Sequence, residues 1–82
     1  MVKEVIRSPS FMRAIKQIDR SYLERVEKLI IKIINYPEIG KPMKYARKGT
    51  REVYLGSFRL SYDYNLSTGI LTFLDIYHKD KQ

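Results

Sequence analysis

The chain has 82 residues, and its composition excludes several classes of protein. It contains no cysteine and one histidine, His78, so disulfides, thiolate chemistry and a zinc site of the Cys/His kind are excluded. Sixteen Lys and Arg residues against nine Asp and Glu residues give a formal net charge of +7. On so small a protein this charge favours polyanionic partners such as nucleic acid, although it is also compatible with a merely soluble surface.

No stretch of the sequence approaches the roughly 20 consecutive apolar residues that a membrane-spanning helix needs. The first seven residues lack the apolar run of a signal peptide. We therefore expect a cytoplasmic protein without a membrane partner, in which residues 1–82 form one domain.

The first part of the chain predicts a short strand over residues 2–6, followed by a helix. Ser8 is typical of an N-cap and Pro9 of the first helical position. The apolar residues between 11 and 18 then recur at spacings of four and three, which indicates one buried helical face.

A second amphipathic helix is predicted after residue 20. Ser21 and Glu24 have the spacing of a capping box, and proline at position 37 requires the helix to end before it. The apolar residues of this helix keep the helical period: Leu23, Val26, Leu29, Ile30, Ile33 and Ile34.

The second half of the chain predicts a loop over 37–42 and then strands. We expect a short edge strand over 44–47 and a strand with alternating apolar residues over 51–55. The alternation changes phase at Gly56-Ser57, which indicates a tight turn or a bulge before the strand that begins at residue 58.

Residues 65–69 have the composition of a hairpin loop. Residues 70–77 are almost continuously apolar, which predicts a central strand buried on both faces. The element order β-α-α-β-β-β predicts an α+β fold, in which an N-terminal helical hairpin packs on one face of a small antiparallel sheet.

The positive charge is concentrated between residues 41 and 51, where five cations occur without an acidic residue. We expect Lys44, Arg47, Lys48 and Arg51 of this run, together with Lys81, to bind nucleic-acid phosphates, although each lysine taken singly is more typical of a solvated surface. The cations of this basic run are Lys41, Lys44, Arg47, Lys48 and Arg51.

Residues 56–62, Gly-Ser-Phe-Arg-Leu-Ser-Tyr, resemble the Gly-x-(Tyr/Phe)-Arg-(Leu/Val)-x-Tyr signature of the RelE/ParE toxin superfamily. In that superfamily a helical hairpin and a loop also precede the signature, and a hydrophobic strand with a short basic or His-containing tail follows it. The Gly40-Lys41-Pro42 segment is similar to the YoeB branch, and Tyr77-His78 resembles the tail of the HigB and YoeB branches. The resemblance in element order covers the whole chain and implies a RelE-like fold.

The resemblance implies a toxin of a type II toxin–antitoxin system that is held silent by a short, acidic, RelB-like antitoxin. It usually implies cleavage of mRNA in the ribosomal A site, by attack of the 2′-hydroxyl of the RNA to leave a cyclic phosphate. This chemistry needs no metal or cofactor. Two alternatives stay open: a ParE-like toxin that inhibits DNA gyrase without cleaving RNA, and a nonenzymatic basic RNA-binding module that uses exposed tyrosines.

Arg59 matches the arginine of the signature, which in the superfamily steadies the scissile phosphate. Strand alternation predicts that Arg59 shares a face with Ser61 and Asp63. The simpler interpretation is that Arg59 pairs with Asp63 or Asp75 across the sheet.

The tail supplies the other catalytic candidates. His78 has the one side chain with an ordinary pKa near neutrality and, on the resemblance, is a general acid or base just past the last strand. Tyr77 is a candidate to stack on a base or donate a proton. Lys79 takes the place of a family arginine and is a candidate phosphate ligand. Each of the three also fits an ordinary strand-end or surface residue.

The sequence also departs from the branches it resembles. Two lysines of the RelE branch fall at about Glu52 and Tyr54, and a glutamate of the YoeB branch is replaced near Met43. The terminal tyrosine of the RelE branch is absent. Glu52 is a candidate substitute base, although a surface strand glutamate is the simpler interpretation.

Overall fold

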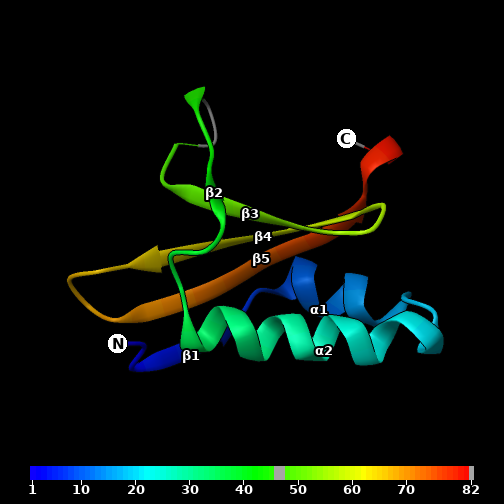
Figure 1. Ribbon diagram of the computed structural model, residues 1–82, viewed down its shortest axis with the longest axis horizontal. Helices are drawn as coiled ribbons and strands as arrows, with labels where there is room; N and C mark the ends of the chain where they lie inside the picture. The colour runs from blue at the N-terminus through cyan, green and yellow to red at the C-terminus, as the bar shows by residue number, and fades with distance from the viewer. Residues whose placement is uncertain (46–47, 82) are drawn as a thin grey trace.

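The computed structural model describes residues 1–45 and 48–81, with the side chains of residues up to 80. The elements in chain order are β1 (Glu4–Arg7), α1 (Pro9–Lys16), α2 (Arg20–Asn35), β2 (Lys41–Pro42), β3 (Thr50–Leu55), β4 (Phe58–Asn65), β5 (Ile70–His78) and a 3₁₀ turn (Lys79–Lys81). The strands form one sheet in the order β1-β5-β4-β3-β2, and α1 and α2 cover one of its faces (Figure 1). The predicted α+β class is confirmed. In the described part of the chain, neither helix combines the length and the hydropathy of a membrane-spanning segment.

The edge strand β1 pairs in parallel with β5, whereas the remaining strand pairs are antiparallel. The sequence predicted an antiparallel sheet, and β1 adds a parallel edge to it. No hairpin joins β1 to its neighbour, because both helices and three strands lie between them along the chain. Its direction is therefore set by tertiary packing and not by a turn.

The start of α1 follows the prediction. The Phe11 backbone N–H donates to Ser8 Oγ over 3.1 Å, and Pro9 occupies the first turn of the helix. Ser8 Oγ also donates to the Leu74 carbonyl oxygen over 2.6 Å. The same side chain therefore caps α1 and fixes that helix to β5.

The start of α2 differs from the prediction. Asp19, and not Ser21, is the N-cap: both the backbone N–H and the hydroxyl of Ser21 donate to the Asp19 carboxylate, over 3.4 and 3.1 Å. Glu24 instead lies 3.6 Å from the Lys28 ammonium, one turn further along the exposed face. A carboxylate two residues earlier competes with the serine for the free backbone donors of the first turn. The helix ends at Asn35, before the proline, as predicted.

The predicted edge strand over 44–47 is wrong where the structure describes it. The strand is β2, Lys41–Pro42, which pairs with Glu52 and Arg51 of β3. Tyr45 has a backbone φ of +58°, a left-handed conformation that ends an extended segment. Residues 46 and 47 of the predicted strand lie outside the described residues.

The phase change at Gly56-Ser57 is a tight turn, since Leu55 pairs directly with Phe58 and Gly56 has a φ of +58°. The predicted hairpin loop between β4 and β5 is confirmed. A β-bulge lies in β5 instead: Ser61 pairs with Asp75 and Tyr62 with Phe73. The bulge leaves Leu74 as an extra residue and reverses the parity of the strand.

The prediction that β5 is buried on both faces is wrong. Leu71, Phe73 and Ile76 are buried against the helices, whereas Asp75 and Tyr77, on the other face, are partly exposed. Without the bulge, all odd-numbered residues of β5 would share one face. Because of the bulge at Leu74, Leu71 and Phe73 face the helices, whereas Asp75 and Tyr77 face away from them, and the apolar sequence gives no sign of this change.

The hydrophobic core lies between the helices and the sheet. The Phe11 ring of α1 stacks on Phe73 of β5 with ring centroids 5.3 Å apart. The buried apolar side chains come from both helices and from β4 and β5: Phe11, Val26, Ile30, Ile33, Leu60, Tyr62, Leu71, Phe73 and Ile76.

The Tyr62 hydroxyl fixes the segment that leaves α2. It donates to the Pro37 carbonyl oxygen over 2.8 Å and accepts from the Gly40 backbone N–H over 2.9 Å. A side chain at position 40 would put its Cβ 2.6 Å from this hydroxyl, so glycine is required there. Arg51 reinforces the segment by donating to the Glu38 and Gly40 carbonyl oxygens over 3.0 and 2.9 Å. Burial raises the pKa of Tyr62 above its ordinary value.

We expect Tyr62→Phe to lower the free energy of unfolding by about 1–3 kcal/mol, because the buried Gly40 N–H and the partly buried Pro37 carbonyl lose their partner. Urea denaturation measures this. Tyr64→Phe is the matched control, since the Tyr64 hydroxyl makes an exposed contact with the N-terminal amine. Equal losses in the two variants would contradict the assigned role of the Tyr62 hydroxyl.

We also expect the stabilising effect of Tyr62 to depend on pH. The folded state raises the pKa of Tyr62 above 10.0, so it favours the protonated phenol. The stabilisation is therefore complete below pH 10 and is lost as the pH rises through the folded-state pKa. The difference in unfolding free energy between wild type and Tyr62→Phe should shrink above pH ~10. A difference that stays constant into this range would contradict the raised pKa.

Candidate functional site: the open face of the sheet

The sheet face opposite the helices, here called the open face, gathers polar side chains from β3, β4 and β5. Arg59 pairs in register with Tyr54 on one side and Tyr77 on the other, and Ser61 pairs with Glu52 and Asp75. In Figure 1 the segment after β2 and the C-terminal turn both rise on this side of the sheet. The face toward the helices is occupied by the hydrophobic core. The open face is therefore the surface on which polar groups can meet a ligand.

The Arg59 guanidinium lies over the Tyr54 ring, with Cζ 3.9 Å from the ring centroid. Its Nη1 donates to the carbonyl oxygens of Gly56 and Phe58 over 3.3 and 3.2 Å. Among the residues that the structure describes, Arg59 forms no ion pair with an aspartate, so the pairing with Asp63 or Asp75 is not observed. Arg59 shares its face with Ser61 and Asp63, as alternation predicted.

Glu52 and Tyr77 form the second feature of the open face. The Tyr77 hydroxyl donates to Glu52 Oε2. Glu52 is 4% exposed, so it is not the surface glutamate of the simpler interpretation. Burying a carboxylate is costly unless it is hydrogen-bonded, and Tyr77 supplies one such bond. A hollow of about 200 Å³ beside the pair is lined by Met43, Thr50, Glu52, Ser61, Leu74, Asp75 and Tyr77.

His78 lies on the other face of the sheet from Arg59. It is the last residue of β5 and pairs with Phe58, whose ring it meets edge-on at 5.6 Å. Its Nδ1 accepts from the Asp80 backbone N–H over 3.2 Å and lies 3.5 Å from the Asp80 carboxylate. The hollow beside His78 is lined by residues of α1 as well as β5. The structure therefore does not bring His78 together with Arg59, and its predicted catalytic role stays a prediction.

The predicted phosphate-binding cations divide into two groups. Lys44 and Lys48 are exposed in the segment between β2 and β3, and Lys79 is exposed beyond β5, where its backbone N–H donates to the Ser57 carbonyl oxygen. Arg51 points to the helix-covered side and holds the segment before β2. Arg47 and the side chain of Lys81 lie outside the described residues.

The sequence analysis did not predict that Glu52, Tyr54, Arg59 and Tyr77 lie together on the open face. For three of them a signal existed: Glu52 and Tyr54 occupy even positions of β3, and these positions face the same way as the odd positions of β4, which include Arg59. The signal for Tyr77 was hidden, because the bulge at Leu74 changes the parity of β5.

The sequence from residue 5 to residue 82 matches the family model for the ParE toxin of the type II toxin–antitoxin system, parDE. The chain belongs to this toxin family. The match confirms the RelE/ParE superfamily resemblance. A search of curated proteins finds no match.

Solved toxin structures resemble the fold of this ParE-family chain along nearly its whole length. The RelBE2 toxin–antitoxin complex from Mycobacterium tuberculosis matches with a TM-score of 0.84 and 20% identity, over 95% of this chain and 99% of that one. A YoeB/ParE toxin from Agrobacterium tumefaciens matches at 0.80 and 17% identity, over 93% and 98%. The archaeal RelE–RelB complex from Pyrococcus horikoshii matches at 0.75 and 16% identity, over 100% of both chains. At these identities the likeness establishes the RelE-like fold.

We expect Tyr77→Phe to lower the free energy of unfolding by about 1.5–3 kcal/mol, because the buried Glu52 carboxylate loses a charge-assisted hydrogen bond. Chemical denaturation measures the loss. Tyr54→Phe is the control, since it keeps the ring on which Arg59 stacks. A Tyr77→Phe protein as stable as wild type would show that the Glu52–Tyr77 bond is not formed in solution.

Proposed function

We propose that this toxin is a ribosome-dependent mRNA endonuclease whose reacting phosphate binds on the open face. The observation that carries the proposal is the position of Arg59 between an aromatic ring and a tyrosine–carboxylate pair on adjacent strands. The proposal is supported further by the exposed lysines on the segment before β3 and on the tail after β5. RNA phosphates need cations of this kind for binding.

The reaction moves one proton in net from the 2′-hydroxyl to the leaving 5′-oxygen, in two transfers. The 2′-oxygen of the RNA attacks the adjacent phosphorus, the bond from phosphorus to the 5′-oxygen breaks, and a 2′,3′-cyclic phosphate and a 5′-hydroxyl form. One group accepts the 2′-hydroxyl proton and another protonates the leaving 5′-oxygen. Negative charge grows on the phosphate oxygens in the transition state, where a fixed guanidinium stabilises it.

Arg59 fits the electrostatic role. Its guanidinium is held by Tyr54 and by two carbonyl oxygens, so little conformational freedom is lost when a phosphate binds.

Tyr77 and Glu52 fit the proton-transfer role as a hydrogen-bonded pair. The phenol gives its proton to the 5′-oxygen, and the carboxylate accepts the proton of the 2′-hydroxyl and returns it to the phenolate. The pair then ends in the protonation state in which it began. His78 retains its predicted acid or base role as the competing hypothesis, which requires the substrate to reach past the end of β5.

The proposal includes an antitoxin as partner. RelB-containing complexes among the similar structures support a short RelB-like antitoxin, and the net charge of +7 suits an acidic segment that orders on the toxin. Action at the ribosome implies a cytoplasmic location, and we retain the interpretation of residues 1–82 as one domain.

A second candidate function is inhibition of DNA gyrase without RNA cleavage. It is favoured by the match to the ParE family model. This function needs no proton-transfer pair, so the buried Glu52 and its bond to Tyr77 would then have a structural role alone.

Primer extension on translated mRNA, with and without ribosomes, tests the proposal. We expect wild-type cuts within codons that require ribosomes. Arg59→Ala and Tyr77→Phe should each reduce cutting by ~10²-fold or more, because each removes a transition-state contact. Arg13→Ala, which removes an exposed arginine of α1, is the matched control and should cut like wild type.

Two outcomes would contradict parts of the proposal. If His78→Ala abolishes cutting while Tyr77→Phe retains it, the acid or base role belongs to His78. If the wild-type protein cuts no mRNA with or without ribosomes, the nuclease proposal fails, and a DNA supercoiling assay with gyrase tests the second candidate.

A further inference from the structure

Tyr45 is the most exposed tyrosine among the described residues and has an unusual backbone conformation. The residue is 92% exposed. Its φ of +58° is left-handed, which costs a non-glycine residue roughly 1–2 kcal/mol. An aromatic ring in solvent on a strained backbone adds no packing energy in the isolated chain. Strain of this kind concentrates at ligand-binding positions.

Tyr45 lines a hollow on the segment before β3 together with Tyr54 of β3. This hollow, of about 310 Å³, is lined by Lys41, Pro42, Met43, Lys44, Tyr45 and Tyr54. Tyr54 is the residue over which the Arg59 guanidinium stacks, at 3.9 Å. The hollow and the proposed phosphate site therefore share the Tyr54 ring as a common wall. If an RNA phosphate binds at Arg59, the neighbouring nucleotide can occupy this hollow.

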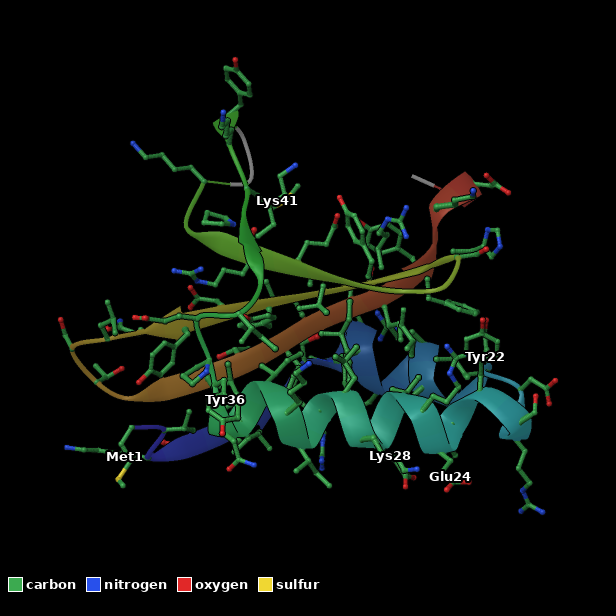
Figure 2. The ribbon with its side chains drawn as sticks, viewed as in Figure 1. Met1, Tyr22, Glu24, Lys28, Tyr36 and Lys41 are labelled. Atoms are coloured by element: carbon green, nitrogen blue, oxygen red, sulfur yellow. The ribbon has the colours of Figure 1, made fainter. Side chains whose placement is uncertain are left out.

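The charge around the hollow selects the chemistry of its occupant. Two lysines line it, and the sequence has no acidic residue between Glu38 and Glu52. Figure 2 shows Lys41 on the side of the sheet away from the helices. Exposed aromatic rings interleaved with cations suit single-stranded nucleic acid, because bases stack on the rings while the cations bind phosphates. The apolar hollow at the end of α2, which Tyr36 and Glu38 line, lacks this concentration of lysines.

We propose that Tyr45 and Tyr54 form a base-stacking subsite for the nucleotide next to the scissile phosphate, with Lys44 as its phosphate ligand. This inference rests on the proposed nuclease function and names a binding determinant of the same site. Stacking on Tyr45 would tolerate every base, since each base has an aromatic face. The subsite thus holds the RNA in place and contributes little to the choice of base.

Fluorescence titration of a short single-stranded RNA tests the subsite. The RNA carries 2′-O-methyl groups, which prevent the cleavage reaction, and a 2-aminopurine reports on stacking. We expect Tyr45→Ala to raise Kd roughly tenfold and to abolish the quenching of 2-aminopurine, whereas Tyr45→Phe retains both. Tyr36→Ala is the matched control: Tyr36 is 64% exposed, and Figure 2 shows it beside the end of α2, on the helix side.

Salt dependence separates stacking from charge. Lys44→Ala should reduce the slope of log Kd against log salt by about 0.7, the value for one phosphate contact with a single strand. Tyr45→Ala should leave that slope unchanged, because the phenol ring carries no charge.

Tyr45→Gly separates binding from folding. Glycine adopts a positive φ without strain, so this variant should unfold at the wild-type temperature or above while it binds RNA as weakly as Tyr45→Ala. A variant that lost both stability and affinity would overturn the inference, because Tyr45 would then have a structural role.

Three further results would overturn the inference: no binding of the RNA by wild type, wild-type affinity in Tyr45→Ala, or a loss of affinity that reduces the salt slope. Retained RNA affinity with weakened binding of an acidic antitoxin-like peptide would identify a protein-docking surface instead, and would overturn it too. Primer extension on the same variants judges the nuclease separately. If wild type and Tyr45→Ala make the same ribosome-dependent cuts, the nuclease function is supported and the Tyr45 subsite is excluded.

Discussion

The path of the segment between α2 and β3, which carries the exposed Lys44 and Lys48, depends on the hydroxyl of Tyr62. The Tyr62 ring lies in the core, 6.3 Å from the Phe73 ring, while its hydroxyl reaches two backbone groups of the segment that leaves α2. Because the donor and the acceptor both belong to the main chain, the hydroxyl fixes the path of that segment and not merely a side chain. Gly40 permits the close approach, and β2 begins at the next residue. The lysines before β3 therefore stand where they do because of a residue in the core.

The strands serve two purposes because their side chains alternate between faces. Leu60 and Tyr62 bury apolar area on the helix side of β4, which stabilises the fold. Arg59, the residue before Leu60, points to the open face. The open face holds a buried carboxylate, Glu52 of β3, to which the Tyr77 hydroxyl of β5 donates a hydrogen bond. Few of these polar groups contribute to the core, so the open face is available for chemistry that the fold does not require.

The parts of the fold that the sequence predicted correctly are local. The Ser8 cap, the end of α2 and the turn at Gly56 each follow from a few neighbouring residues. The errors arose where two local signals competed or where the deciding contact is remote. Asp19 displaced Ser21 as N-cap, because both side chains can accept from the backbone N–H groups of that turn and Asp19 precedes Ser21. The parallel pairing of β1 with β5 follows from packing across more than 60 residues of chain, to which periodicity is blind.

Short-range patterns in the sequence were enough to predict the class of fold and the face on which Arg59 lies, because hydrophobic periodicity depends on neighbouring residues alone. Which side chains meet depends on contacts between residues far apart in the chain. The bulge at Leu74 reverses the parity of β5, so Tyr77 joins Arg59 and Glu52 on the open face while His78 turns to Phe58 on the other. One extra residue in a strand is invisible in an apolar run, yet it exchanges the two faces for every residue beyond it.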